Sequence, residues 1–158
     1  MRLEKFTEKA QEAILEAQER ARGENHSQVE AEHLLLALLR QSDGSVPQIV
    51  RQLGSDPELL IRKVEEALGE LPRAYGATTQ IYLSPSLQRL LERAQAEAVA
   101  MRDEYVSTEH LFLALADEGA AGASSEILHQ QGITKDRILQ ALTTVRGSQR
   151  VTSPNPEE

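Results

Sequence analysis

The sequence contains Val29-Glu-Ala-Glu-His-Leu-Leu-Leu-Ala-Leu38 and, 77 positions later, Val106-Ser-Thr-Glu-His-Leu-Phe-Leu-Ala-Leu115. The two stretches are identical at seven of ten positions. In each, a Glu-His pair precedes an apolar run, which is typical of a buried helix that begins at its polar residues. Self-similarity on this scale indicates one supersecondary unit that occurs twice in the chain.

The repeat extends to both sides of these stretches. After them the offset becomes 78, which matches Gly54 with Gly132. The sequence therefore predicts repeat one at residues 6–72, a joining segment at 73–82 and repeat two at 83–146. Apolar residues also match in steps of three or four, the period of one helical face: Phe6, Ala10, Ile14, Ala17 and Ala21 with Leu83, Leu87, Leu91, Ala94 and Ala98.

Start and stop signals divide each repeat into about four helices. One amphipathic copy leaves an apolar face uncovered, so we expect the copies to pack as a pseudo-twofold pair. The predicted fold is all-α, one domain over residues 1–146, with residues 147–158 beginning a linker. The expected helix starts are Thr7, Glu30, Asp56-Pro57, Ser84-Pro85, Ser107 or Thr108, Ser125 and Thr134, with a further helix ending at Leu53-Gly54.

Composition excludes several classes of protein. The net charge of −8, without a cationic cluster, argues against binding to nucleic acid or to an anionic membrane. The chain has no cysteine, so it forms no disulfide or iron–sulfur centre, which fits the cytoplasm. No apolar run is long enough for a signal peptide or a membrane span.

Motifs that carry catalytic chemistry are missing. The sequence has no G-x-x-x-x-G-K-[ST] phosphate loop, no G-x-G-x-x-G and no G-x-S-x-G. H-E-x-x-H is also absent, although His33 and His110 occupy matching places. A structural role for these histidines, in packing or hydrogen bonding at the seam between the copies, is favoured over metal binding. We expect a binding module without catalytic residues, metal or cofactor in this fragment.

Four polar residues at expected helix starts allow two interpretations. Structurally, Thr7 and Ser84 act as N-caps, and Glu32 and Glu109 are acids that the helix macrodipole favours. Functionally, a helix N-terminus binds anions and an exposed carboxylate binds cations. Thr7 with Glu32, and Ser84 with Glu109, would then hold a ligand that bears a phosphate beside a guanidinium. A fifth residue, Asp103, is a solvated loop acid in the structural interpretation.

Several stretches resemble the duplicated amino-terminal domain of the Clp ATPases. They are Phe6-Thr-Glu-Lys-Ala-Gln-Glu-Ala-Ile14 and the two Glu-His stretches. Within that family, Tyr82-Leu-Ser-Pro-Ser-Leu87, Arg102-Asp-Glu-Tyr-Val-Ser107 and the tail from Gln149 are most similar to the ClpB-type disaggregating chaperones. A ClpC-type unfoldase, which feeds a protease, is the nearest alternative.

The resemblance implies a substrate-recognition domain on a homohexameric ATPase ring. It implies that this domain engages unfolded or aggregated polypeptide, that ATP and Mg bind to the full-length protein, and that DnaK-type chaperones cooperate with it. Family positions linked to substrate engagement map onto Thr7, Asp103 and Glu109. The phosphoarginine pocket of ClpC-like relatives maps onto Thr7 with Glu32 and Ser84 with Glu109.

Overall fold

The computed structural model describes residues 3–75, 80–120, 122–146 and 151–156. Parts of the expected joining segment (76–79) and of the expected linker (147–150 and 157–158) lie outside these residues. The described elements are η1 (Leu3–Lys5), α1 (Glu8–Gly23), β1 (Gln28–Val29), α2 (Ala31–Leu39), α3 (Ser45–Gln52), α4 (Pro57–Gly69), β2 (Tyr82–Leu83), α5 (Pro85–Ala100), α6 (Thr108–Ala116), α7 (Ala123–Gln130) and α8 (Lys135–Arg146).

This order confirms the all-α fold, with eight α-helices in the described part of the chain and four in each repeat. Most of the helices begin where local capping signals place them, but α7 begins at Ala123, after Gly122, and not around Ser125 as expected. The Asp56 side chain accepts a hydrogen bond from the Glu58 backbone at 3.0 Å, and Pro57 occupies the first turn. Thr134 accepts from the Arg137 backbone at 3.2 Å at the start of α8. Side chains therefore satisfy backbone groups that a helix start leaves free.

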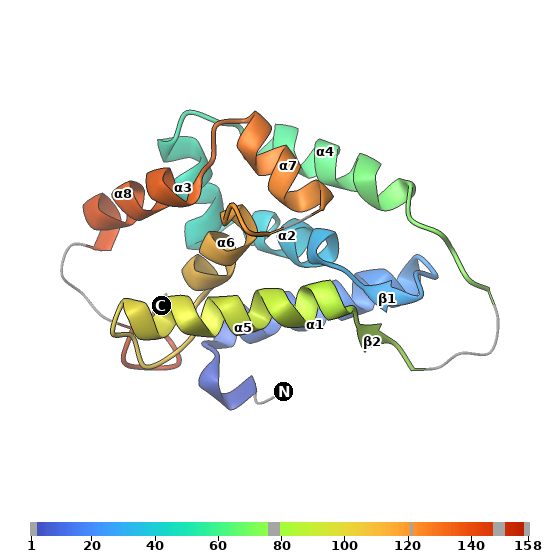
Figure 1. The fold of residues 1–158 in the computed structure, drawn as a ribbon, viewed down its shortest axis with the longest axis horizontal. Coiled ribbons are helices and arrows are strands. Elements are labelled where there is room, and N and C mark those ends of the chain that lie inside the picture. Colours follow the sequence, from blue (N-terminus) through green and yellow to red (C-terminus); the bar gives the residue numbers. More distant parts are fainter. Residues whose placement is uncertain (1–2, 76–79, 121, 147–150, 157–158) are drawn as a thin grey trace.

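Two helices form the centre of the molecule. In Figure 1, α2 and α6 lie in the middle, with α1 and α5 on one side and α3, α4, α7 and α8 on the other. Every residue of α6 is buried, and so is every residue of α2 except Glu32. The apolar runs of the repeated stretches thus build the core, and Glu32 is the one residue of α2 that reaches toward solvent.

Two short parallel pairings tie the repeats together in a reciprocal way. β1 of repeat one pairs with β2 at the start of repeat two, with Val29 opposite Leu83. Phe6, at the start of repeat one, pairs with Val106 in repeat two. These are the same two positions of the repeat with their partners exchanged, so the pairings support the expected pseudo-twofold arrangement.

The tail returns to the domain. Val151 is buried, with 4% of its surface exposed, and its carbonyl accepts a hydrogen bond from the Glu104 backbone at 2.7 Å. The Pro154 carbonyl accepts from the Glu8 backbone at 2.8 Å. Residues 151–154, which were expected to begin a linker, therefore pack against both repeats.

A membrane crossing was not expected from the sequence. Among the described helices, none has both the length and the apolar character that a bilayer span requires.

Candidate functional site

Thr7 and Ser84 are N-caps, as the sequence predicts. The Thr7 hydroxyl accepts a hydrogen bond from the Ala10 backbone at 3.2 Å, and the Ser84 hydroxyl accepts from the Leu87 backbone at 3.0 Å. Both residues are buried, with 0% and 2% of their surface exposed. Their hydroxyls therefore stabilise α1 and α5 from within the fold.

The backbone of each cap is bound to the other repeat. The Thr7 N–H donates to the Val106 carbonyl at 2.9 Å, two residues before α6 begins. The Ser84 N–H donates to the Val29 carbonyl at 3.0 Å, two residues before α2 begins. Thr7 thus lies at the helix start that carries Glu109, and Ser84 lies at the one that carries Glu32.

The expected pairing of Thr7 with Glu32 and of Ser84 with Glu109 is therefore exchanged in the structure. The physical reason is the reciprocal strand pairing, which sets the start of each repeat against the middle of the other. We call the first group, Thr7, Asp103, Val106, Glu109 and Arg146, the Thr7 edge. The second group, His26, Val29, Glu32, His33 and Ser84, is the Ser84 edge.

The two matching histidines cap their own helices. The Glu30 N–H donates to His33 Nδ1 at 2.8 Å, and the Ser107 N–H donates to His110 Nδ1 at 2.8 Å. Each histidine stands at the third helical position, where a glutamate or glutamine closes a capping box in other proteins. The structural role that these bonds show is the capping of a helix start within each copy, whereas the sequence placed that role at the seam between copies.

One group of possible metal ligands is found among the described residues: Glu24, His26 and His33 place ligand atoms within 4.8 Å of one another. His33 Nε2 lies 2.8 Å from His26 Nδ1. Because His33 Nδ1 accepts the Glu30 N–H, the proton of the neutral ring lies on Nε2, which donates to His26. That hydrogen-bond pattern fits a buried histidine pair better than a metal centre, whose ligand histidines donate their second nitrogen.

Asp103 is not the solvated loop acid of the structural interpretation. Its side chain is 0% exposed. One oxygen lies 2.7 Å from His110 Nε2, and the other accepts hydrogen bonds from Arg146 Nη2 and from the Val151 N–H, each at 2.7 Å. Burial by itself raises the pKa of Asp103, but these donors outweigh it and hold that pKa below its usual value. Asp103 is thus a buried anion that joins α6, α8 and the tail.

The two repeated glutamates have different partners. Glu109 is 8% exposed, and its Oε1 lies 3.5 Å from Arg146 Nη1, so it is not the exposed anion of the functional interpretation. Glu32 is only partly buried, and no described cation lies within ion-pair distance of it. Burial raises the pKa of Glu32, with Glu30 adding to the shift. In the part of the chain that the structure describes, Glu32 therefore has no cation to neutralise its charge.

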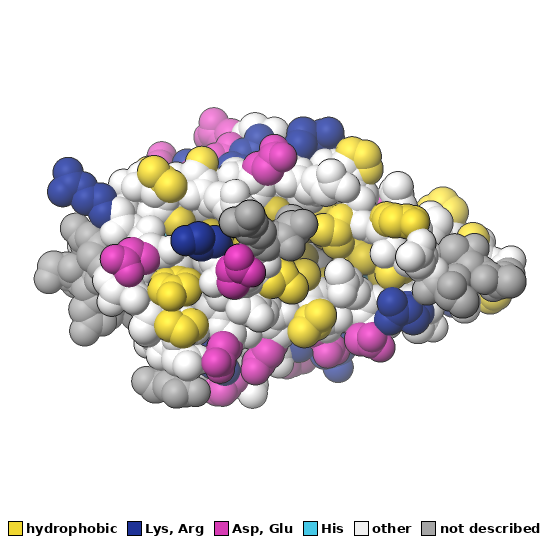
Figure 2. Space-filling model, turned by 90° about the horizontal axis from the view of Figure 1, so that it is seen from below, with side chains coloured by type: hydrophobic (Ala, Val, Ile, Leu, Met, Phe, Trp, Pro, Cys, Tyr) yellow, Lys and Arg dark blue, Asp and Glu magenta, His cyan; other side chains and the backbone are white. Residues whose placement is uncertain are grey.

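A pocket of about 560 Å³ adjoins the Thr7 edge. Its apolar wall includes Ala98 and Val106 together with Val99, which is 76% exposed. Figure 2 shows hydrophobic and acidic side chains interspersed on the face seen from below Figure 1. We call the pocket of about 560 Å³ the Thr7-edge pocket. Its lining residues are Lys5, Glu92, Gln95, Ala98, Val99, Asp103, Glu104 and Val106.

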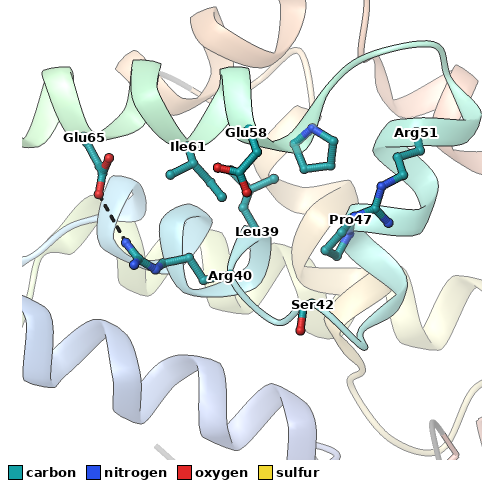
Figure 3. Close-up of a pocket in the computed structure, with 9 residues that line it drawn as sticks. Leu39, Arg40, Ser42, Pro47, Arg51, Glu58, Ile61 and Glu65 are labelled. Atoms are coloured by element: carbon teal, nitrogen blue, oxygen red, sulfur yellow. Dashed lines mark hydrogen bonds and ion pairs between the residues drawn. The ribbon is translucent and has the colours of Figure 1, made fainter.

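A second pocket, of about 320 Å³, lies between the end of α2, α3 and the start of α4 (Figure 3). Leu39 and Ile61 face it, and Arg40 reaches across to Glu65, with 3.2 Å between Nη1 and Oε2. Arg51 and Glu58 stand on its rim. None of the five predicted residues lines this pocket, which we call the α3–α4 pocket.

Three residues were not singled out from the sequence: Arg146 and His26, which belong to the two edges, and Val99, which lines the Thr7-edge pocket. Val99 sits on the outer side of a helix, where nothing local distinguishes it from an ordinary surface residue. Arg146 reaches Asp103 only because α8 packs against α6. His26 could have been found from the sequence, because the 77-residue offset aligns it with Asp103. In the structure, each of these two residues contacts the capping histidine of its own repeat.

Comparison with known proteins places this geometry in a family. Residues 5–131 match the model of the Clp repeat (R) N-terminal domain. Chaperone protein ClpB of Nitratidesulfovibrio vulgaris is 42% identical over 161 residues, an alignment that covers 100% of this chain and 19% of that protein. The chain thus spans about a fifth of the length of this relative.

Solved structures share the fold. The Hsp104 N-terminal domain from Candida albicans superposes with a TM-score of 0.84 at 25% identity, covering 97% of this chain and 99% of that one. A ClpV N-domain in complex with a VipB peptide gives a TM-score of 0.72 at 19% identity, covering 95% of this chain and 92% of that one. The second likeness concerns the fold alone.

Proposed function

This chain belongs to the family of Clp repeat N-terminal domains, the non-catalytic modules of Clp ATPases, and we propose that it is the substrate-docking module of a protein-disaggregating chaperone. It binds segments of unfolded or aggregated polypeptide and passes them to the ATPase ring of the whole protein. The ClpB relatives, which match along the entire chain, favour this role over others in the family.

The observation that carries the proposal is the Thr7-edge pocket. An exposed valine on a helix surface is ordinary when it stands alone, but Val99 adjoins Ala98 and Val106 in one pocket of about 560 Å³. A pocket of this size holds a few apolar side chains of a polypeptide. Segments that are normally buried in a folded protein supply such side chains when that protein unfolds.

Charge around the pocket selects among unfolded segments. Glu92 and Glu104 line it, and the chain as a whole carries −8. Lys5 is the one cation among the lining residues. The pocket therefore favours apolar segments flanked by lysine or arginine over acidic ones.

Glu32 provides a second docking point on the Ser84 edge. In repeat two the matching Glu109 is paired with the guanidinium of Arg146. In repeat one the residues that match Arg146 are Leu68 or Gly69, according to the offset used, and among the described residues no cation pairs with Glu32. A cationic side chain of a substrate takes that place. Two separate docking points suit weak and promiscuous binding.

A second candidate is the receptor for phosphoarginine tags or adaptors, the function of a ClpC-type domain. The open carboxylate of Glu32 beside Ser84 favours it, because a guanidinium next to a phosphate would meet a carboxylate next to a helix N-terminus. Only the Ser84 edge is open in this way, since Arg146 occupies the matching place on the Thr7 edge. Calorimetry with free phosphoarginine separates the two candidates; binding that Glu32→Gln abolishes would favour the receptor.

The remaining properties belong to the whole protein. By its likeness to the ClpB proteins, we infer a cytoplasmic homohexamer that binds ATP with Mg outside this domain and cooperates with DnaK-type chaperones. The threading of substrate would follow its docking on this domain.

Fluorescence anisotropy with a labelled, permanently unfolded polypeptide tests the docking role. Val99→Asp places a charge on the wall of the Thr7-edge pocket and should weaken binding roughly fivefold, the equivalent of about 1 kcal/mol. Leu15→Asp is the matched control, because Leu15 is also exposed (51%) but lines neither pocket described above. If both substitutions weakened binding equally, the Thr7-edge pocket would not be the docking site.

A further inference from the structure

The tail lies in extended contact across the Thr7 edge. The Val151 N–H donates to Asp103 Oδ1 at 2.7 Å, and its carbonyl accepts from the Glu104 N–H at 2.7 Å. The Pro154 carbonyl then accepts from the Glu8 N–H at 2.8 Å, in the first turn of α1. Residues 151–154, which can be followed in red in Figure 1, are thus bound at both of their ends.

The contacts hold the backbone of this segment and one of its side chains. Val151 is 4% exposed, whereas Thr152, Ser153 and Pro154 are exposed. An edge that binds backbone groups and one aliphatic side chain accepts many sequences, which is how extended peptides are recognised by other proteins. The tail therefore shows what kind of polypeptide fits the Thr7 edge.

The matching segment of repeat one is held differently. The Ala74 N–H donates to the Asn25 carbonyl at 2.8 Å, beside the bridge between Arg73 and His26. At the start of α5 the residue that matches Glu8 is Pro85, which has no N–H to donate. The bond between the tail and the first turn of a helix is thus particular to the Thr7 edge.

The tail is held weakly, because the free energy of its contacts is largely offset by the entropy lost when it is ordered. Between described residues, three hydrogen bonds exchanged with water and one buried valine stabilise it, and the ordering of four residues opposes it by a similar amount. A segment held so weakly exchanges with any competitor that offers the same groups.

We propose that residues 151–154 are a displaceable internal ligand of the Thr7 edge, and that an unfolded substrate binds there as an extended segment with an aliphatic side chain in the place of Val151. This inference rests on the proposed docking function and adds its binding mode and its regulation. The tail competes with substrate, so docking at this edge strengthens whenever the tail is released.

The experiment uses the full chain with two substitutions that loosen the tail by different means. Val151→Ser removes the buried aliphatic group. Glu8→Pro removes the N–H that binds Pro154 and keeps the helix start, since proline is favoured in the first turn and occurs at the matching Pro85. Thr152→Ala, an exposed neighbour in the same segment, is the matched control.

Affinity for a permanently unfolded polypeptide is measured for each form, with helix content checked by circular dichroism. We expect both loosened forms to bind about five to ten times more tightly than the native chain, and the control to bind as the native chain does. A synthetic peptide of residues 151–156 should compete with the unfolded polypeptide on the loosened forms.

The possible failures are distinguishable. If the native chain binds the unfolded polypeptide but neither loosened form gains affinity, the internal-ligand inference is wrong and the docking function stands. If no form binds, the docking function is wrong and the inference falls with it. If affinity rises but the tail peptide does not compete, substrate uses another surface and the inference is again overturned.

Discussion

Arg146 Nη2 donates to Asp103 Oδ1 at 2.7 Å, which joins the end of α8 to the loop before α6 across 43 residues of sequence. The other Asp103 oxygen lies 2.7 Å from His110, the histidine that caps α6. One buried carboxylate thus links the capping of α6, the last helix and the tail, so its removal leaves the buried Arg146 guanidinium with only the longer, 3.5 Å contact to Glu109 among the described residues.

Asp103→Ala should therefore be severely destabilising. Removing one partner of a buried ion pair costs about 3–5 kcal/mol, because the other charge stays buried. The free energy of unfolding from urea denaturation checks this, with Glu19→Gln as the control. Glu19 pairs with Arg22 on the surface, at 2.8 Å, and should cost less than about 1 kcal/mol. A cost below about 1 kcal/mol for Asp103→Ala would show that the buried network contributes little.

The two N-caps should contribute similar amounts of stability. Thr7→Ala and Ser84→Ala each remove a hydroxyl that accepts a backbone hydrogen bond, and each should cost about 1 kcal/mol in the free energy of unfolding. Thr7→Ser and Ser84→Thr retain the acceptor and should cost less than half of that. If the alanine variants were as stable as the native chain, the caps would have no structural role, and a role in ligand binding would be the better explanation of these residues.

Stability should fall in mild acid because of His33. Burial, helped by His26 and Arg20, lowers its pKa from 6.5 to about 4. Between these values the unfolded chain binds the proton and the folded chain does not, so the free energy of unfolding decreases as the pH falls from 6.5 to 4. At about 1.4 kcal/mol per pH unit, the loss amounts to about 3 kcal/mol.

The matched variant for this pH dependence is His33→Gln. Glutamine at the third helical position still accepts the capping hydrogen bond but does not titrate. Burial also lowers the pKa of His110, so part of the slope should remain in the variant. Asp103 has a lowered pKa and contributes only at more acidic pH. Denaturation series at several pH values check this; an unchanged slope in the variant would contradict the assignment to His33.

Substitution of Glu32 should affect substrate binding, whereas substitution of Glu109 should affect the stability of the fold. Glu32→Gln removes a partly buried carboxylate that lacks a cation, so stability at neutral pH should stay the same or rise by up to about 1 kcal/mol. Binding of an arginine-containing unfolded peptide should weaken several-fold. Glu109→Gln takes a partner from Arg146 and should destabilise instead. Thermal unfolding and anisotropy on both variants check this, and loss of stability in Glu32→Gln would place Glu32 in the structural network.

The helices and the caps were predictable because their signals are local. Thr7, Asp56-Pro57 and Ser84-Pro85 each mark a helix start within two or three residues, and the structure has α1, α4 and α5 begin there. The repeat itself predicted that each helix would have a counterpart.

The composition of the two edges was not predictable in this way. Phe6 pairs with Val106, which follows it by more than the length of a repeat, and no local pattern reports such a partner. Asp103 sits in a short polar loop that looks solvated until α8 and the tail cover it. The sequence thus indicated candidate polar residues that remain a prediction as a binding site, and it grouped Thr7 and Ser84 with their own repeats, whereas the structure binds each of them to the other repeat.

The most direct test of the docking claim is an NMR titration of the isotope-labelled chain, residues 1–158, with a permanently unfolded polypeptide. We expect amide shifts that saturate together at Ala98, Val99 and Val106 around the Thr7-edge pocket, and at Glu32 on the Ser84 edge. Shifts confined to the α3–α4 pocket, around Leu39, Arg51 and Ile61, or no shifts at all, would contradict it.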